Sequence, residues 1–268
     1  MKKLNPIIVI ALLGLYSMVP YAYASPTVDE IVARANHVAF YQGNDGRAET
    51  RMKIVESNGQ TQLRQFTILR KDKSEDADQD FFVFFQRPSD VHRTSFLVKK
   101  HINSDDDRWL YLPSLDLVKR ISSGDKRTSF VGSHFFYEDV SGRALTEDKH
   151  TLIETTETHY VIDNVPVDPN SVEFKHYKVW VNKGTFMPER SVYFGQNEEA
   201  IRTVESLEQQ TIDGYITTTK MKVSDHRTGG YTFSEIRFIA YDIGITDDVF
   251  SERSLRMPPN EWLERPSR

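Results

Sequence analysis

The sequence predicts a mainly β protein, in which roughly a dozen antiparallel strands form a strongly curved sheet wrapped around helices. Three observations predict this fold class. Segments with strand periodicity follow one another from residue 48 to residue 242. An amphipathic helix precedes them, and an aromatic segment at residues 123–148 interrupts them without a clean period. No repeat, low-complexity tract or Pro/Gly-rich linker divides the chain, so we expect residues 25–268 to form a single domain.

Residues 1–24 have the pattern of a secretory signal peptide. Two lysines are followed by an apolar run of 13 residues and by a small-x-small cleavage site that ends at Ala24. A helix that spans a bilayer needs about 20 apolar residues, which disfavours a retained membrane helix. We therefore expect cleavage after Ala24 and a soluble protein in the periplasm.

The composition of the chain excludes several classes of protein. The 268 residues contain no cysteine, so no disulfide stabilises the fold and no cysteine after the cleavage site can take a lipid. Without Lys2 and Lys3, 32 of the 34 basic residues remain, against 39 acidic residues. This mildly acidic balance disfavours nucleic-acid binding, which needs clustered basic side chains.

The segment after the cleavage site predicts an amphipathic helix of about four turns that ends before Gly43. Thr27 and Glu30 have the spacing of a capping box, in which each side chain satisfies a backbone N–H of the other residue. The apolar side chains that recur at helical spacing are Val28, Ile31, Val32, Ala35 and Val38.

The strands follow in two groups. The first is expected at about residues 48–54, 62–70, 81–85, 95–98, 109–112 and 117–122, and the second at about 150–163, 173–182, 188–195, 200–209, 213–224 and 231–242. Asn58-Gly59 is a strong signal for a two-residue hairpin turn. A short helical turn is expected from Asp247, followed by a loosely held tail from Pro258.

Three strands of the first group are apolar on both faces, namely those at 81–85, 95–98 and 109–112. Such a strand has something packed against each side, or lines a cavity on one of them. The segment at 123–148 is the candidate lid, because it is aromatic but lacks a two-residue period. We expect it to be irregular or briefly helical and to pack over the face of the sheet.

The sequence lacks the motifs of common enzyme and cofactor sites. Its eight histidines form no H-x-x-x-H or H-E-x-x-H pair, and no Gly-x-Ser-x-Gly, P-loop or Gly-x-Gly-x-x-Gly motif is present. We therefore predict no catalytic residue, no metal and no cofactor. For the acidic pair Glu138-Asp139, capping or an ion pair with Arg143 is favoured over acid–base catalysis. A hydrogen-bonding or surface role is expected for His134, while a Ser-His-Asp arrangement from distant strands stays open.

Aromatic residues make up 12% of the chain and are concentrated at 81–85, 109–111 and 130–137. An ordinary packed core is one interpretation, and a cavity for an apolar ligand is the other. Each buried methylene contributes about 0.8 kcal/mol, so an acyl chain of roughly 14 carbons would gain about 11 kcal/mol before ordering costs. The side chains predicted to line such a cavity are Phe66, Ile68, Phe82, Phe84, Phe96, Trp109, Tyr111, Phe130, Phe135 and Phe136.

Several motifs resemble the LolA-like periplasmic family, whose members are described as outer membrane lipoprotein-sorting proteins. These motifs are Trp109-Leu110-Tyr111-Leu112-Pro113, Lys119-Arg120-Ile121, Ser129-Phe130-Val131-Gly132-Ser133, Tyr137-Glu138-Asp139, Tyr177-x-Val179-Trp180-Val181 and the stretches 84–88 and 247–255. The chain departs from the family at His134, where Asp is usual, and near Arg93, where the family has Gly.

The resemblance implies an incomplete, strongly curved antiparallel β-barrel whose concave face is covered by helices. Between the helices and the sheet it implies an apolar cavity for acyl chains. It also implies a partnership with an RND-type (MMPL-like) inner-membrane transporter. The lipoprotein carriers LolA and LolB share this fold more distantly.

On this basis we expect a non-enzymatic carrier of a lipid or lipid-modified cargo between the inner and outer membranes, with only transient membrane contact. The alternative is a non-enzymatic accessory or adaptor subunit of an inner-membrane transporter, in which the barrel is a scaffold without lipid cargo. A third hypothesis is a periplasmic hydrolase that acts on lipid-like substrates.

Overall fold

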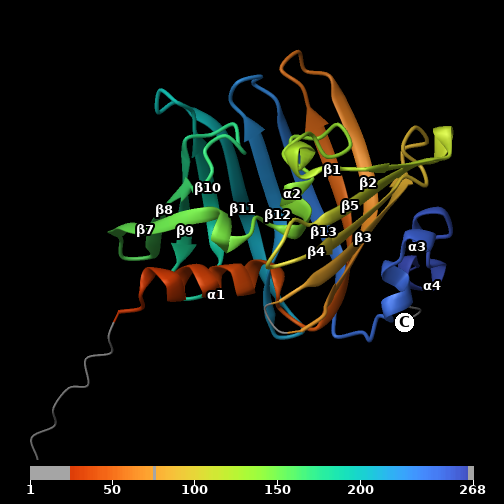
Figure 1. Ribbon diagram of the computed structural model, residues 1–268, viewed down its shortest axis with the longest axis horizontal. Coiled ribbons are helices and arrows are strands. Elements are labelled where there is room, and N and C mark those ends of the chain that lie inside the picture. The colour runs from red at the N-terminus through yellow and green to blue at the C-terminus, as the bar shows by residue number, and fades with distance from the viewer. Residues whose placement is uncertain (1–24, 75–76, 265–268) are drawn as a thin grey trace, which may run out of the picture.

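The computed structural model describes residues 25–74 and 77–264, and the predicted signal peptide lies outside the described residues. Thirteen strands form one antiparallel sheet in the order β6-β5-β4-β3-β2-β1-β13-β12-β11-β10-β9-β8-β7 (Figure 1). The edge strands β6 and β7 do not pair with each other, so the curved sheet is not closed. The predicted incomplete β-barrel is therefore confirmed.

The strands are β1 (Asp45–Val55), β2 (Thr61–Asp72), β3 (Gln79–Arg87), β4 (Ser95–Lys100), β5 (Asp107–Leu112), β6 (Leu117–Arg120), β7 (Asp148–Thr155), β8 (His159–Pro166), β9 (His176–Asn182), β10 (Pro188–Phe194), β11 (Ala200–Ile212), β12 (Tyr215–Asp225) and β13 (Tyr231–Tyr241). The helices are α1 (Val28–Phe40), α2 (Glu138–Ser141), α3 (Glu252–Arg256) and α4 (Asn260–Leu263), with short 3-10 turns η1 (Pro113–Leu115), η2 (Ser123–Asp125), η3 (Leu145–Glu147) and η4 (Asp247–Phe250).

The helix α1 begins at the predicted capping box. The Thr27 hydroxyl accepts a hydrogen bond from the Glu30 backbone N–H at 3.3 Å, and the Glu30 carboxylate accepts one from the Thr27 N–H at 2.8 Å. This exchange satisfies two backbone donors that the first turn leaves free. The buried face of α1, which carries Ile31 and Ala35, packs on β8 and β9 at one end of the sheet (Figure 1).

The strand β3 is buried on both faces because different elements pack against each. On the concave face, Phe81, Val83 and Phe85 join an apolar cluster beneath the segment between β6 and β7. On the convex face, Phe82 and Phe84 pack with the C-terminal helices. The expectation for strands that are apolar on both faces is therefore confirmed.

We name residues 121–147, between β6 and β7, the lid segment. It contains η2, α2 and η3 and lies over the concave face, as Figure 1 shows for α2. The predicted irregular or briefly helical segment over the sheet is confirmed. Since it joins the two edge strands of the sheet, it crosses the open side of the barrel.

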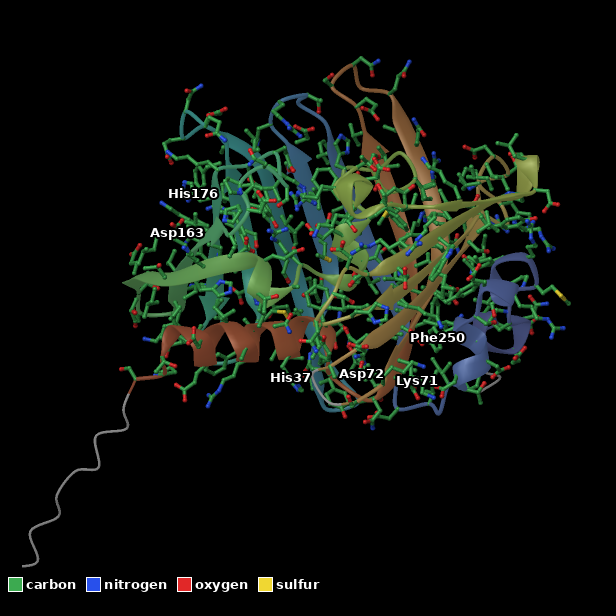
Figure 2. The ribbon with its side chains drawn as sticks, viewed as in Figure 1. His37, Lys71, Asp72, Asp163, His176 and Phe250 are labelled. Carbon is green, nitrogen blue, oxygen red and sulfur yellow. The ribbon has the colours of Figure 1, made fainter. Side chains whose placement is uncertain are left out.

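The C-terminal helices cover the convex face of β3, β4 and β5, where Phe250 lies (Figure 2). The prediction of a loose tail from Pro258 is wrong for the part of it that the structure describes. Leu263 is buried in the convex cluster, and Arg47 donates hydrogen bonds to the backbone carbonyls of Trp262 at 2.9 Å and Leu263 at 2.8 Å. These bonds satisfy carbonyls at the end of a helix, which the sequence pattern did not reveal.

The expected strand at 150–163 is two strands, β7 and β8, joined by a tight turn. The Thr156 hydroxyl forms this turn, since it accepts hydrogen bonds from the backbone N–H groups of Thr158 at 3.3 Å and His159 at 2.8 Å. A threonine hydroxyl can stand in for a backbone acceptor in this way. The turn was missed because it contains no Gly, Pro or Asn.

Candidate functional site

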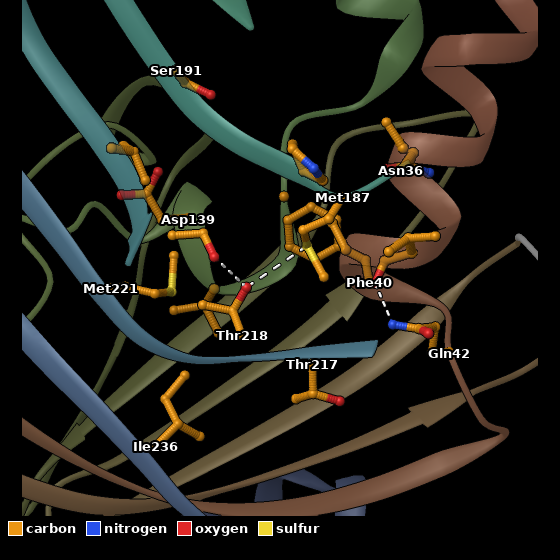
Figure 3. A pocket seen from close by; sticks show the side chains of 18 of the residues that line it. Asn36, Phe40, Gln42, Asp139, Met187, Ser191, Thr217, Thr218, Met221 and Ile236 are labelled. Atoms are coloured by element: carbon orange, nitrogen blue, oxygen red, sulfur yellow. Dashed lines mark hydrogen bonds between the residues drawn. The ribbon is translucent and has the colours of Figure 1, made fainter. Parts of the chain in front are cut away.

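A cavity of about 500 Å³ lies between the concave face of the sheet, α1 and the lid segment. Ligand sites in proteins occupy about 300–1,000 Å³, so this volume is within their usual range. Figure 3 shows Phe40 and Asn36 reaching the cavity from α1 while Met221 and Ile236 point into it from the sheet. The cavity therefore has walls from segments that are far apart in the sequence.

The floor of the cavity is apolar because alternate residues of neighbouring strands face it. The floor side chains are Ala48 and Met52 of β1, Ile68 of β2, Val83 of β3, Val179 of β9, Val204 of β11, Met221 of β12 and Ile236 of β13. Among them lies Ser234, whose buried hydroxyl has no hydrogen-bond partner within the part of the chain that the structure describes. An apolar surface with a few polar groups is typical of a ligand site.

Phe130 anchors the lid segment to the sheet. Its ring centroid lies 5.5 Å from that of Phe96, 5.7 Å from Phe85 and 6.1 Å from Phe66. Tyr137 lies edge-on to it at 5.6 Å. These tilted and edge-to-face contacts are the favoured geometries for aromatic pairs. The anchor leaves Phe130 and Phe66 at the border of the cavity.

The carboxylate of Glu138, at the start of α2, is buried among three cations. Its oxygens lie 2.5 Å from Arg127, 3.1 Å from Lys126 and 3.3 Å from Arg143. Burial by itself would raise the pKa of Glu138, but the three positive charges outweigh it and lower that pKa to about 2. Glu138 is thus ionised, and it ties α2 to the rest of the lid segment.

The neighbouring Asp139 pairs instead with Arg202 of β11. Arg202 is 1% exposed as a residue, and its guanidinium lies 4.4 Å from the centroid of the Phe136 ring, a cation–π contact. The two adjacent carboxylates of α2 therefore point to different cations. For this acidic pair the sequence favoured capping or an ion pair with Arg143, and the ion pair is confirmed for Glu138.

Lys100 of β4 contacts both the end of α2, in the lid segment, and the end of α1. Its ammonium donates a hydrogen bond to the Ser141 carbonyl at 2.8 Å and lies 5.3 Å from the Phe40 ring and 5.1 Å from the Tyr41 ring. Burial lowers the pKa of Lys100 to about 8, although nearby acidic residues oppose the shift. This buried lysine is a contact shared by both elements that cover the cavity.

The structure divides the ten side chains predicted to line the cavity. Those that line it are Phe66, Ile68, Phe130 and Phe135. Phe96 lies deeper, in the aromatic cluster beneath the lid segment. The Phe136 ring contacts the guanidinium groups of Arg127 and Arg202, at 5.0 Å and 4.4 Å from its centroid.

The other four are on the convex face, packed with the C-terminal helices; they are Phe82, Phe84, Trp109 and Tyr111. The reason is the two-residue period of a strand, in which neighbours point to opposite faces. Where both faces are apolar, the period carries no signal that tells the concave face from the convex one.

Sequence reasoning missed the half of the cavity that α1 and the strands β8 to β13 provide. A usable signal was present, since Tyr177, Val179 and Val181 alternate on one face of β9 and all three line the cavity. The alternation within one strand could not have revealed the polar side chains that line the cavity. Asn164 and Tyr177 reach the cavity from different strands, and the Tyr177 hydroxyl donates a hydrogen bond to Asp148 at 2.8 Å.

His134 has the hydrogen-bonding role that the sequence predicted. Its ring Nδ1 lies 2.9 Å from the Thr232 hydroxyl, and its backbone N–H donates to the same oxygen at 3.0 Å. Within residues 25–74 and 77–264, no group of three or more His, Asp or Glu side chains is close enough to hold a metal ion. The helices in those ranges are all too short or too polar to cross a membrane.

Comparisons with known proteins place the chain in a family. The model of a family described as an uncharacterized protein matches residues 77–257, more than half of the chain. No curated protein matches the sequence.

Several solved structures are similar. A DUF1329 family protein from Desulfovibrio piger is 28% identical with a TM-score of 0.77, over 84% of this chain and 96% of that one. A putative outer membrane lipoprotein-sorting protein domain from Vibrio parahaemolyticus is 26% identical with a TM-score of 0.74, over 85% of this chain and 96% of that one. A LolA superfamily protein from Nitrosomonas europaea, 17% identical over 85% of this chain and 99% of that one, shares the fold with a TM-score of 0.66. The chain therefore belongs to this uncharacterized family and shares the fold of the LolA superfamily protein.

Proposed function

We propose that this protein is a periplasmic carrier that binds the acyl chains of a lipid or a lipid-modified cargo and moves it between the inner and outer membranes. The observation that carries the proposal is the apolar cavity of about 500 Å³ on the concave face. The similarity to a putative lipoprotein-sorting domain supports the same class of cargo. In this proposal the protein performs no covalent chemistry.

The covering elements give a carrier a way to weaken its hold on the cargo. An acyl chain gains about 0.8 kcal/mol for each methylene that the cavity covers, so partial uncovering would weaken its binding in steps. The lid segment contacts the sheet through side chains such as Phe130 and Lys100. Side-chain contacts of this kind can break without disrupting the strands below, so the lid segment can open while the barrel stays folded.

The proposal includes an RND/MMPL-type transporter of the inner membrane as a partner, which the family resemblance alone supports. It also includes export to the periplasm through the predicted signal peptide. The adaptor alternative would need an interior filled by its own side chains. The cavity favours the carrier over the adaptor for this reason.

Mass spectrometry of lipids that co-purify with the protein tests the proposal. We expect a phospholipid, a lipopeptide or another acyl lipid in the native protein, and its loss in Met221→Trp, which fills the cavity. Lys222→Trp is the matched control, since Lys222 is the next residue on β12 and lies over the Tyr231 ring rather than in the cavity. Lipid-free protein from several preparations that also fails to bind a fluorescent fatty acid would refute the carrier.

A further inference from the structure

The strands β12 and β13 pair over only half of their length. Their register runs from Lys220 opposite Glu235 to Ser224 opposite Tyr231 and stops there. Yet β12 stays paired with β11 as far as Tyr215, and β13 stays paired with β1 to its last residue, Tyr241. Residues 215–219 and 236–241, all of them described, therefore border a split in the wall of the barrel. We name this split the slot.

Bulges in both strands explain the slot. On β12, Glu208 pairs with Lys220 and the next residue of β11 pairs with Thr218, so Thr219 is an extra residue. On β13, the register with β1 shifts at Phe238, which has a φ of 51°. A bulge increases the twist of its strand and can end the pairing with a neighbour. Both bulges lie just beyond the last pair of β12 and β13, Lys220 opposite Glu235, where the two strands separate.

The slot separates the inner cavity from a second pocket on the outside of the sheet. The outer pocket has a volume of about 300 Å³ and includes Ile212, Thr219 and Phe238 in its lining. Ile236 and Ile239 line both the outer pocket and the inner cavity. The two spaces are therefore adjacent, and the side chains between them are apolar.

The rim of the outer pocket is charged, while its centre is apolar. Lys220 pairs with Glu208 at 2.6 Å, and Arg237 pairs with Glu235 at 2.6 Å. Phe238 lines the same pocket and is 47% exposed, although large apolar side chains usually avoid water. An apolar centre with a polar rim suits a molecule that has a hydrocarbon tail and a polar head.

Side chains, rather than a backbone ladder, bridge the far end of the slot. The hydroxyls of Thr217 and Tyr241 lie 2.9 Å apart, and the Tyr215 ring lies 4.9 Å from that of Tyr241. Gln42, which follows α1, donates to the Ile216 carbonyl of β12 at 2.6 Å. The slot can thus widen by the movement of a few side chains, without unzipping the ladders that β12 and β13 form with β11 and β1.

We propose that the slot is the passage through which an acyl chain enters and leaves the cavity. This inference rests on the proposed function and adds the route that the cargo takes. The hydrocarbon tail passes between Ile216 of β12 and Ile236 and Ile239 of β13, while the polar head stays at the charged rim. The route needs no removal of the aromatic anchor that holds the lid segment.

Cross-linking across the slot tests the route, because a chain without cysteine accepts a pair of thiols at chosen positions. The slot pair is Thr217→Cys with Phe238→Cys, joined by a bismaleimide whose linker contains a reducible disulfide. The control pair is Lys222→Cys with Phe233→Cys, which face each other in the paired half of the same two strands. The readout is the rate at which a fluorescent fatty acid loads into the protein.

We expect the linked slot pair to load at least tenfold more slowly than the same protein before linking, and reduction of the linker to restore the rate. Recovery on reduction shows that the variant is folded. The linked control pair should load at the unlinked rate. Unchanged loading through the linked slot, in a variant that binds the probe, overturns the route and leaves the carrier standing. Absence of binding in the unlinked variants and in the native protein overturns the carrier itself.

Discussion

The ring of Phe40, the last residue of α1, lies against the α-carbon of Gly142, the residue that directly follows α2. A β-carbon at Gly142 would come within 2.7 Å of two atoms of that ring. Gly142 also has a φ of 78°, which side chains rarely adopt. The two helices that cover the cavity therefore meet at a point where only glycine fits.

Gly142→Ala is expected to destabilise the protein by about 2–4 kcal/mol, because the backbone strain adds to a clash with Phe40. Gly244→Ala is the control, since Gly244 has the same φ of 78° with nothing within 4 Å of its β-carbon position. Only the strain, about 1 kcal/mol, should appear there. Urea unfolding of both variants measures the difference, and equal losses would contradict the contact.

Glu138→Gln is expected to destabilise the protein by about 3 kcal/mol at pH 7, because three buried cations lose their shared anion. The pKa of Glu138 is lowered to about 2 in the folded protein, from an ordinary value of 4.5. Its stabilisation is therefore complete above pH 4.5 and is lost as the pH falls toward 2.

Unfolding free energies of the native protein and Glu138→Gln between pH 7 and pH 3 check this expectation. The difference should shrink as the solution becomes more acidic. Glu157→Gln, at the exposed turn between β7 and β8, is the control and should change stability by less than about 0.5 kcal/mol. A difference between the native protein and Glu138→Gln that is constant with pH would argue against the buried ion pairs.

Lys100 predicts a gain of stability with rising pH at the alkaline end of the range. Its pKa is about 8 in the folded protein, against an ordinary value of 10.5, so the unfolded chain binds the proton more tightly. The cost of burying the charge, about 3 kcal/mol, is present below pH 8 and disappears as the pH rises to 10.5. The native protein should gain this stability over that range relative to Lys100→Met.

Denaturant unfolding at pH 7, 8, 9 and 10 measures the gain. Lys99→Met is the matched control, since Lys99 is the neighbouring residue of β4 and points to the other side of the strand. The free-energy difference between Lys99→Met and the native protein should stay level over the series. A parallel pH profile for Lys100→Met and the native protein would show that the ammonium is not desolvated.

Arg47→Met is expected to release the C-terminal helix α4 from the convex face. The buried guanidinium holds the carbonyls of Trp262 and Leu263, and its loss leaves them without that donor. Hydrogen exchange of residues 260–264 should accelerate at least tenfold. Arg51→Met, at an exposed position of the same strand, should leave that exchange unchanged. Protection equal to that of the native protein in Arg47→Met would show that the apolar cluster holds α4 by itself.

Local sequence determined the elements that depend on near neighbours. The capping box of Thr27 and Glu30 started α1, because its hydrogen bonds join residues three positions apart. A hairpin at Asn58-Gly59 joins β1 to β2 as expected, but the prediction of a two-residue turn is wrong, since the Glu56 N–H donates to the Gln60 carbonyl and leaves a three-residue loop. The open, curved antiparallel sheet followed from the succession of strand periods and from the family resemblance. The turn at Thr156 escaped because a hydroxyl formed it in place of the usual turn residues.

Tertiary structure alone decided which side of each two-faced strand meets the cavity. Phe81 and Phe82 are equally apolar, yet one packs beneath the lid segment and the other beneath α3 and α4. The pairing of Glu138 with three cations likewise depends on side chains that the fold brings together. The slot depends on the pairing of β12 and β13, whose bordering residues are distant in sequence. The two-residue period of a strand shows that neighbouring side chains point to opposite faces. Which face lines the cavity is decided by the segments, distant in sequence, that pack against each face.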